Sequence, residues 1–243
     1  MNRDLRFGPE VYGWGAGIFF ASYTVFEIPS NLLLERYGAR VWIARIMITW
    51  GVLAMMMAAV VGQKSFFAIR FLLGVAEAGF FPGVILYFTY WLPKNYRGRA
   101  IAGMFLAFTL ATAVTPVISG ALLELNGVLG MHGWQWLFIV EGLPAILLAI
   151  PIFLVLPDKP VNAKWLAQDE IAWLEETVGE NGKAAQPKER WIRRIPMDLN
   201  LIALSHMWFG VTATGYGITL FAARHESPRE QPDVKARLDR PML

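Results

Sequence analysis

The 243-residue sequence contains no cysteine, and only 17% of its residues are charged. Without thiols the chain forms no disulfide and has neither a cysteine nucleophile nor a cysteine-containing zinc site. A soluble domain usually carries about a quarter charged residues. The low charge, 56% hydrophobic residues and a mean hydropathy of +0.42 therefore predict an integral membrane protein. A net charge of +3 is too small to indicate nucleic-acid binding.

The sequence also offers little that could perform catalysis. Its three histidines, His132, His206 and His225, have no ligand or base partner at a usable spacing, so neither a metal site nor hydrolase chemistry is indicated. No Gly-x-x-x-x-Gly-Lys-Ser/Thr phosphate loop is present. We therefore expect no enzyme activity, no cofactor and no ATP-driven step.

Long apolar stretches are what the sequence does contain. Six of them approach or exceed the roughly 20 residues that a helix needs to cross a ~30 Å hydrocarbon core. They cover residues 11–34, 41–62, 65–92, 100–123, 134–156 and 199–223. They are apolar on all faces and contain interior Gly and Pro, which a membrane bundle tolerates. The sequence predicts an all-α integral membrane protein with six transmembrane helices.

Lysine and arginine are concentrated in the first, third and fifth connections between these stretches. The positive-inside rule places these three connections in the cytoplasm. Both ends conflict with that topology, because residues 1–10 contain Arg3 and Arg6 on the outer side and residues 224–243 form a basic tail after an outward crossing. No signal-peptide pattern resolves the conflict at the start.

The fifth connection is the one sizeable aqueous segment. Within it, Ala167, Ile171, Leu174 and Val178 recur at helical spacing, and Asn162 stands where it could cap the helix. We expect an amphipathic helix packed on the bundle, with partner binding as the alternative.

The first connection contains a recognisable motif. It reads Asn31-Leu-Leu-Leu-Glu35-Arg36-Tyr-Gly38-Ala-Arg40. It resembles the signature Gly-x-Leu-x-Asp-Arg-x-Gly-Arg-Arg/Lys of the major facilitator superfamily, with matches at Leu33, Arg36, Gly38 and Arg40, Glu35 in place of Asp, and departures at Asn31 and Ala39. Gly38 permits a tight turn, and the basic residues can pair with Glu35 or with helix ends.

The third stretch carries a longer resemblance. It reads Arg70-Phe-Leu-Leu-Gly74-Val-Ala-Glu77-Ala-Gly79-Phe-Phe-Pro82-Gly83 and looks like the fourth helix of the anion:cation symporter branch of that superfamily. Segments 26–31, 97–100 and 134–145 resemble the same branch, so that the likeness covers residues 8 to about 175. Within that branch, these segments most resemble the sequences of bacterial permeases for tartrate-like sugar acids, aromatic acids and related carboxylates.

This resemblance implies a domain organisation. Family members have twelve helices in two halves, and the first stretch here resembles their second helix. Residues 1–10 would be an external segment, 11–157 the N-terminal half without its first helix, 158–198 the cytoplasmic central loop, 199–223 the first helix of the C-terminal half, and 224–243 an aberrant polar tail. We expect a late start codon and a frameshift or truncation to account for the two ends.

Charged side chains inside a membrane are costly and indicate function. Arg70 and Glu77 are seven residues apart, so they share a helix face about 10 Å apart along the axis. The guanidinium of Arg70 suits a substrate carboxylate, and desolvation favours the protonated form that lets Glu77 carry the coupling proton. The resemblance implies the same two roles. The alternative is that Arg70 snorkels to the outer surface while Glu77 bonds a neighbouring backbone.

Three further groups of residues complete the candidate site. Gly74 lies between Arg70 and Glu77, which leaves room for a ligand or for a neighbouring helix. Tyr23 and Glu27 are four residues apart and could line the same cavity from another helix. Glu27 could instead brace a cytoplasmic gate against the loop arginines, which are Arg36, Arg97 and Arg99.

Taken with the resemblance, these residues predict a secondary active transporter. We expect symport of a small organic anion with a proton, or with sodium, by alternating access in the plasma membrane. The intact form is expected to work as a monomer in the lipid bilayer. The chain alone is expected to be inactive, and the alternative is a non-transporting membrane fragment or accessory subunit.

Overall fold

A computed structural model describes residues 5, 7–185, 199–200, 202–207, 209–211 and 214–215. The chain divides into two compact units, Met1–Ala184 and Ala185–Leu243. The described part of the first unit is helical, without strands. Its elements are α2 (Pro9–Tyr37), α3 (Ala39–Met56), η1 (Met57–Ala59), α4 (Gln63–Glu77), α5 (Phe80–Trp91), α6 (Lys94–Leu123), η2 (Val128–Gly130), α7 (Gly133–Val155), η3 (Pro160–Asn162) and α8 (Gln168–Ala185).

Five spans in this unit are long and apolar enough to cross a membrane. They are Pro9–Tyr37, Ala39–Ala59, Gln63–Trp91, Lys94–Leu123 and Gly133–Val155. They coincide with the first five predicted stretches and confirm the all-α membrane fold. In the second unit an apolar helix covers Ile202–Val211. The rest of the sixth predicted crossing and the tail at 224–243 lie outside the described residues.

The third span is broken where the sequence predicts one continuous crossing. Its two parts, α4 and α5, are separated at Ala78 and Gly79. Gly79 has φ +85°, a left-handed conformation that L side chains rarely adopt. Pro82 in the first turn of α5 lacks an N–H, and its ring would clash with the Ala78 carbonyl in a continuous helix. Gly79 and Pro82 therefore permit an interruption of the helix immediately after Glu77.

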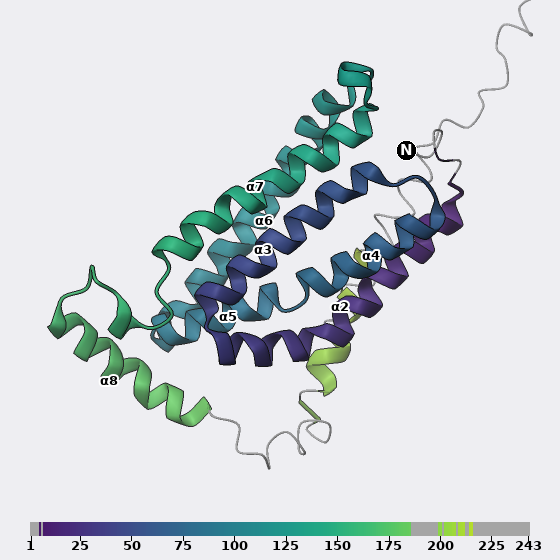
Figure 1. The fold of residues 1–243 in the computed structure, drawn as a ribbon. Coiled ribbons are helices and arrows are strands. Elements are labelled where there is room, and N and C mark those ends of the chain that lie inside the picture. The colour runs from purple at the N-terminus through teal and green to yellow at the C-terminus, as the bar shows by residue number, and fades with distance from the viewer. Residues whose placement is uncertain are drawn as a thin grey trace, which may run out of the picture. The chain divides into compact units, whose positions relative to one another are not determined.

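Two helix pairs, α3 with α7 and α2 with α4, make the most extensive contacts (Figure 1). Glycines allow the first pair to approach closely. A Cβ added to Gly51 would lie 2.7 Å from the carbonyl oxygen of Gly142, and one added to Gly142 would lie 2.6 Å from that of Gly51. Small residues at such crossings let two backbones touch, which is how membrane helices gain packing energy without a hydrophobic drive.

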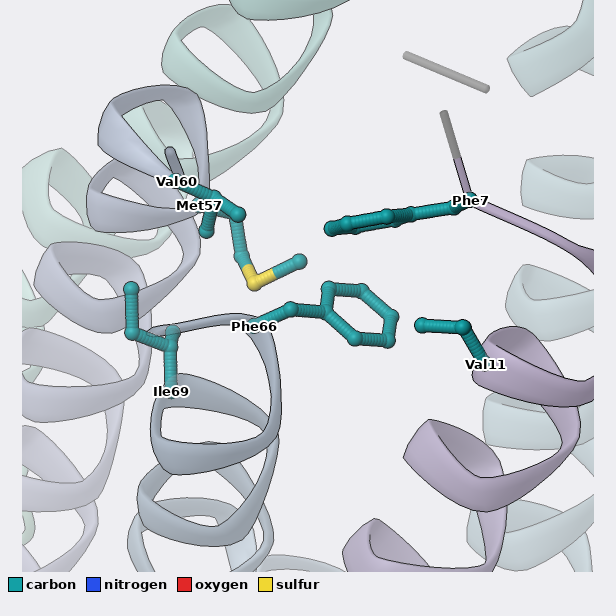
Figure 2. Packing of buried hydrophobic residues seen from close by; sticks show 6 residues of the cluster. All are labelled: Phe7, Val11, Met57, Val60, Phe66 and Ile69. Carbon is teal, nitrogen blue, oxygen red and sulfur yellow. The ribbon is translucent and has the colours of Figure 1, made fainter. Parts of the chain in front are cut away.

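The α2–α4 pair is joined at one end by a cluster of buried apolar side chains. Figure 2 shows Phe66 of α4 pointing toward Phe7, which precedes α2, and Val11 in the first turn of α2, while Ile69 lies on the other side near Met57 and Val60. The rings of Phe7 and Phe66 have centroids 5.4 Å apart. The cluster flanks the second connection, which the charge pattern places outside.

The helix in the central loop begins at a different residue from the one that the sequence predicts. α8 begins at Gln168, and Asn162 belongs to the separate turn η3, so the proposed Asn162 cap is wrong. The carboxylate of Glu170 reaches back instead and accepts a hydrogen bond from the Ala167 N–H at 3.0 Å. The predicted apolar stripe is partly confirmed, because Val178 is buried while Ala167 is exposed.

Candidate functional site

The straight helix α4 carries Arg70, Gly74 and Glu77 on the face that meets α2. Gly74 fixes this arrangement, because a Cβ added there would collide with the Ser22 hydroxyl and the Phe19 carbonyl of α2 and would lie 3.1 Å from the Tyr23 nitrogen. The space beside Gly74, which we expected to hold either a ligand or a neighbouring helix, is therefore occupied by helix α2. Tyr23 lies beside Gly74, and its side chain is half-buried.

The guanidinium of Arg70 lies over an aromatic ring. Its Cζ lies 5.3 Å from the ring centroid of Phe66, which is fully buried. The ring of Tyr12 is 5.7 Å from that of Phe66, so Tyr12 of α2 and Arg70 of α4 both lie beside this ring. The Nε of Arg70 is buried and has no hydrogen-bond partner among the described residues. Because buried donors are almost always paired in folded proteins, this nitrogen has unused capacity to bind an acceptor.

Tyr12 is the site residue that the sequence prediction missed. A signal for it does exist in the sequence, since Tyr12 precedes Tyr23 by eleven residues. Eleven residues are close to three helical turns, so both side chains lie on the same face of α2. A spacing of three turns predicts a shared helix face less firmly than the four-residue spacing of Tyr23 and Glu27, because it requires α2 to remain straight over a longer distance.

Glu77 is the last residue of α4, directly before the break. The break is held in place by α2, because a Cβ on Gly79 would collide with the Ser30 side chain. The hydroxyl of Ser30 in turn accepts a hydrogen bond from Nε1 of Trp42 on α3, at 3.0 Å. Glu77 is half-buried. It lies at a break in the helix that contacts with α2 hold in place, and α2 is in turn hydrogen-bonded to α3.

The loop motif after α2 fastens the α2–α3 turn to the end of α7. Gly38 has φ +87°, and the carboxylate of Asp158 fills the space that a Cβ would need. Asp158 Oδ1 accepts a hydrogen bond from the backbone N–H of Arg40 at 2.8 Å. The Arg40 side chain donates to the Phe153 carbonyl, and its Cζ lies 5.0 Å from the Phe153 ring. The prediction that a motif arginine pairs with a helix end is confirmed for Arg40.

The other predicted gate residues are less closely grouped. Arg97 donates to carbonyls at the end of α5, from Nε to Leu92 at 2.8 Å and from Nη2 to Thr89 at 3.0 Å. Arg36 lies over the Tyr37 ring at 5.7 Å. Glu35, Arg36 and Arg99 are exposed, and Glu27 is half-buried, with its carbonyl accepting a hydrogen bond from Asn31. The contacts described for Arg36 and Arg97 are therefore not to Glu27.

Glu141, another charged residue within a span, has a local partner. Glu141 accepts a hydrogen bond from the Ser119 hydroxyl at 3.2 Å, which joins α7 to α6. No group of three His, Cys, Asp or Glu side chains in the described part of the chain could hold a metal ion.

Comparison with known proteins agrees with the geometry. The model of the Major Facilitator Superfamily matches residues 1–228. The chain is 47% identical over 222 residues to the "Putative tartrate transporter" of Agrobacterium vitis, covering 91% of this chain and 51% of the relative. It is 45% identical over 223 residues to the Quinolone resistance transporter of Acinetobacter baumannii, covering 91% and 51%.

A third relative is more distant. The Inner membrane transport protein RhmT of Escherichia coli K12 is 34% identical over 221 residues, covering 90% of this chain and 50% of the relative. The chain thus spans about half the length of the curated relatives it matches. The match over residues 1–228 and the five apolar spans establish that this chain is a multi-pass membrane protein of the major facilitator superfamily.

Proposed function

We propose that this chain provides the anion-binding and proton-binding part of a secondary active transporter for a small carboxylate. The observation that carries the proposal is the buried Nε of Arg70, which has no hydrogen-bond partner among the residues that the structure describes and lies on the same face of α4 as Glu77. The guanidinium can hold a carboxylate through two parallel hydrogen bonds. The name of the Agrobacterium vitis relative supports tartrate as a representative substrate.

The position of Glu77 supports coupling to a proton as part of this proposal. Ionisable residues within the membrane mark ion pathways, and a desolvated carboxyl group can exchange one proton as the cavity opens to alternate sides. Because Arg70 and Glu77 share one face of α4, the charge of an anion bound at Arg70 would favour a proton on Glu77. Tyr12 and Tyr23 would contribute hydroxyl groups from α2. We place the transporter in the inner membrane, in agreement with the name of the RhmT relative.

A second candidate is a non-transporting membrane fragment or accessory subunit. Its support is the absence of any buried residue in the described helix α6. Uptake of labelled tartrate distinguishes the two candidates. Proteoliposomes with this chain alone should take up no labelled tartrate, whereas a chimera in which the chain replaces the matching segment of the Agrobacterium vitis relative should do so.

The role of Arg70 is tested in that chimera by Arg70→Lys. Lysine keeps the charge but cannot form two parallel hydrogen bonds to a carboxylate. We expect the KM for tartrate uptake to rise about tenfold or more, because one charge-assisted hydrogen bond is lost. Lys64→Arg at the exposed start of α4 is the control and should leave the KM unchanged. An unchanged KM in Arg70→Lys, with normal amounts of folded protein, would leave Arg70 as a snorkelling residue.

A further inference from the structure

An open groove lies between the last turns of α5 and α7, away from the Arg70 site. Its volume is about 620 Å³, and its lining is almost entirely apolar. The lining side chains include Tyr87, Trp91, Leu92, Ile152, Leu156 and Trp165. A small dicarboxylate would find too few polar partners there, because ligand sites for polar molecules place hydrogen-bonding groups among the apolar walls.

The walls of this groove are held in place by their own contacts. The rings of Tyr87 and Trp91 have centroids 5.8 Å apart, and Trp91 stacks on Trp165 at 5.8 Å with an angle of 15° between the planes. The Tyr87 hydroxyl donates a hydrogen bond to the Pro157 carbonyl at 3.1 Å, which ties α5 to the segment after α7. A groove that is already formed loses little ordering entropy when it is filled.

The position of the groove in the membrane follows from the connections that adjoin it. α5 is followed by the third connection and α7 by the fifth, and both are on the cytoplasmic side by the positive-inside rule. Tyrosine and tryptophan rings collect at this boundary in membrane proteins. The groove therefore opens at the level where the headgroups and first methylenes of the inner leaflet lie.

The segments that line the groove carry exposed lysines close in sequence to the lining residues. Three exposed lysines adjoin its lining in sequence: Lys94 follows Leu92 by two residues, Lys159 follows Pro157 by two, and Lys164 precedes Trp165. The same segments contain one acidic residue, Asp158, whose carboxylate accepts a hydrogen bond from the backbone N–H of Arg40, so the three lysines outnumber it. An apolar groove with lysines close in sequence to its lining is complementary to a molecule that has a long apolar chain and an anionic head.

We propose that this groove binds one acyl chain of an anionic phospholipid from the cytoplasmic leaflet, with the headgroup attracted by these lysines. Native mass spectrometry of the full chain tests the proposal, with phosphatidylglycerol and phosphatidylcholine of identical acyl chains as probes. We expect one tightly retained phosphatidylglycerol, preferred over phosphatidylcholine by about fivefold for each lysine that takes part.

Two variants separate the chain-binding and headgroup contributions. Leu156→Trp fills the groove and should weaken retention of both lipids at least tenfold. The double variant Lys159→Gln and Lys164→Gln leaves the groove intact and should abolish the preference while phosphatidylcholine binding persists. The controls are Val117→Trp, at a position on α6 that is 74% exposed, and Lys64→Gln at the outer end, and both should behave as the unmodified chain.

Several outcomes would overturn the proposal. They are equal retention of the two lipids by the unmodified chain, unchanged retention in Leu156→Trp, or an equal loss in Val117→Trp. A dimer mass that disappears in Leu156→Trp would instead make the groove a contact between copies. If Leu156→Trp does not fold, the lysine double variant decides alone, because its two substitutions are at exposed positions.

Discussion

Helices α3 and α6 are both long and apolar enough to cross the membrane, yet they differ completely in how they are packed. α6 is the more apolar of the two spans, with a mean hydropathy of 2.0 against 1.7. In the α3 span 39% of the apolar window is buried, whereas none of the α6 window is. Hydropathy therefore identifies a crossing without indicating whether its neighbours are helices or lipid.

Glycines explain part of this difference. Gly51 of α3 lies against the backbone of α7, and its substitution would bring atoms too close. Gly103 and Gly120 of α6 have nothing within 4 Å of an added Cβ. In the described residues, glycine is thus a packing residue in α3 and α7, while in α6 it leaves a surface that other molecules can cover.

The largest expected effect comes from matched isoleucine truncations. Ile46→Ala in α3 removes a side chain with no exposed surface, whereas Ile118→Ala in α6 removes one that is 47% exposed. We expect Ile46→Ala to lower the free energy of unfolding by about 2–5 kcal/mol, the cost of a core cavity, and Ile118→Ala by less than about 0.5 kcal/mol. Unfolding in mixed micelles with increasing dodecyl sulfate measures both, and equal losses would contradict the packing difference.

A second test uses the glycines themselves. Gly142→Leu forces α7 away from α3, so we expect a loss of about 1–3 kcal/mol, typical of overpacking. Gly120→Leu places the same side chain where nothing lies within 4 Å and should be nearly neutral. Thermal unfolding in detergent compares them. A stable Gly142→Leu protein would mean that α3 and α7 can separate without cost.

The smallest effect is expected where α6 touches α7. Ser119→Ala removes the hydrogen bond to Glu141, and interhelical hydrogen bonds in membranes contribute about 0.6 kcal/mol on average. Thr112→Ala is the control, because the Thr112 hydroxyl bonds to the Thr109 carbonyl within α6. Exchange of deuterium into the α6 amides should rise in Ser119→Ala only. A rise of equal size in Thr112→Ala would mean that the contact to α7 does not order α6.

Sequence reasoning found the helices because each crossing needs a long apolar stretch, and charge interrupts such stretches. It missed the break after Glu77, because Gly79 and Pro82 are tolerated in many continuous membrane helices and only their combination with Ser30 on α2 fixes the interruption. It also misplaced the start of α8, since Asn162 can cap a helix only if the next residues continue into it.

In the candidate site, too, sequence reasoning found what depends on local spacing and missed what depends on contacts between distant segments. The face shared by Arg70 and Glu77 follows from seven-residue spacing alone, and the likeness to a family indicated their roles. The aromatic surroundings of Arg70 required the packing of α2 on α4, since Phe66 and Tyr12 are far apart in sequence. The attachment of Gly38 and Arg40 to Asp158 joins segments more than 110 residues apart, which no local pattern could indicate.

The most direct test of the proposed role of α4 is tartrate accumulation in proteoliposomes that contain the full-length chimera, with and without Glu77→Gln. Glutamine is nearly isosteric but cannot carry a proton. The proposal predicts that Glu77→Gln abolishes accumulation driven by an inward proton gradient while exchange of internal for external tartrate continues. Accumulation equal to that of the unmodified chimera would contradict the assignment of the coupling proton to Glu77.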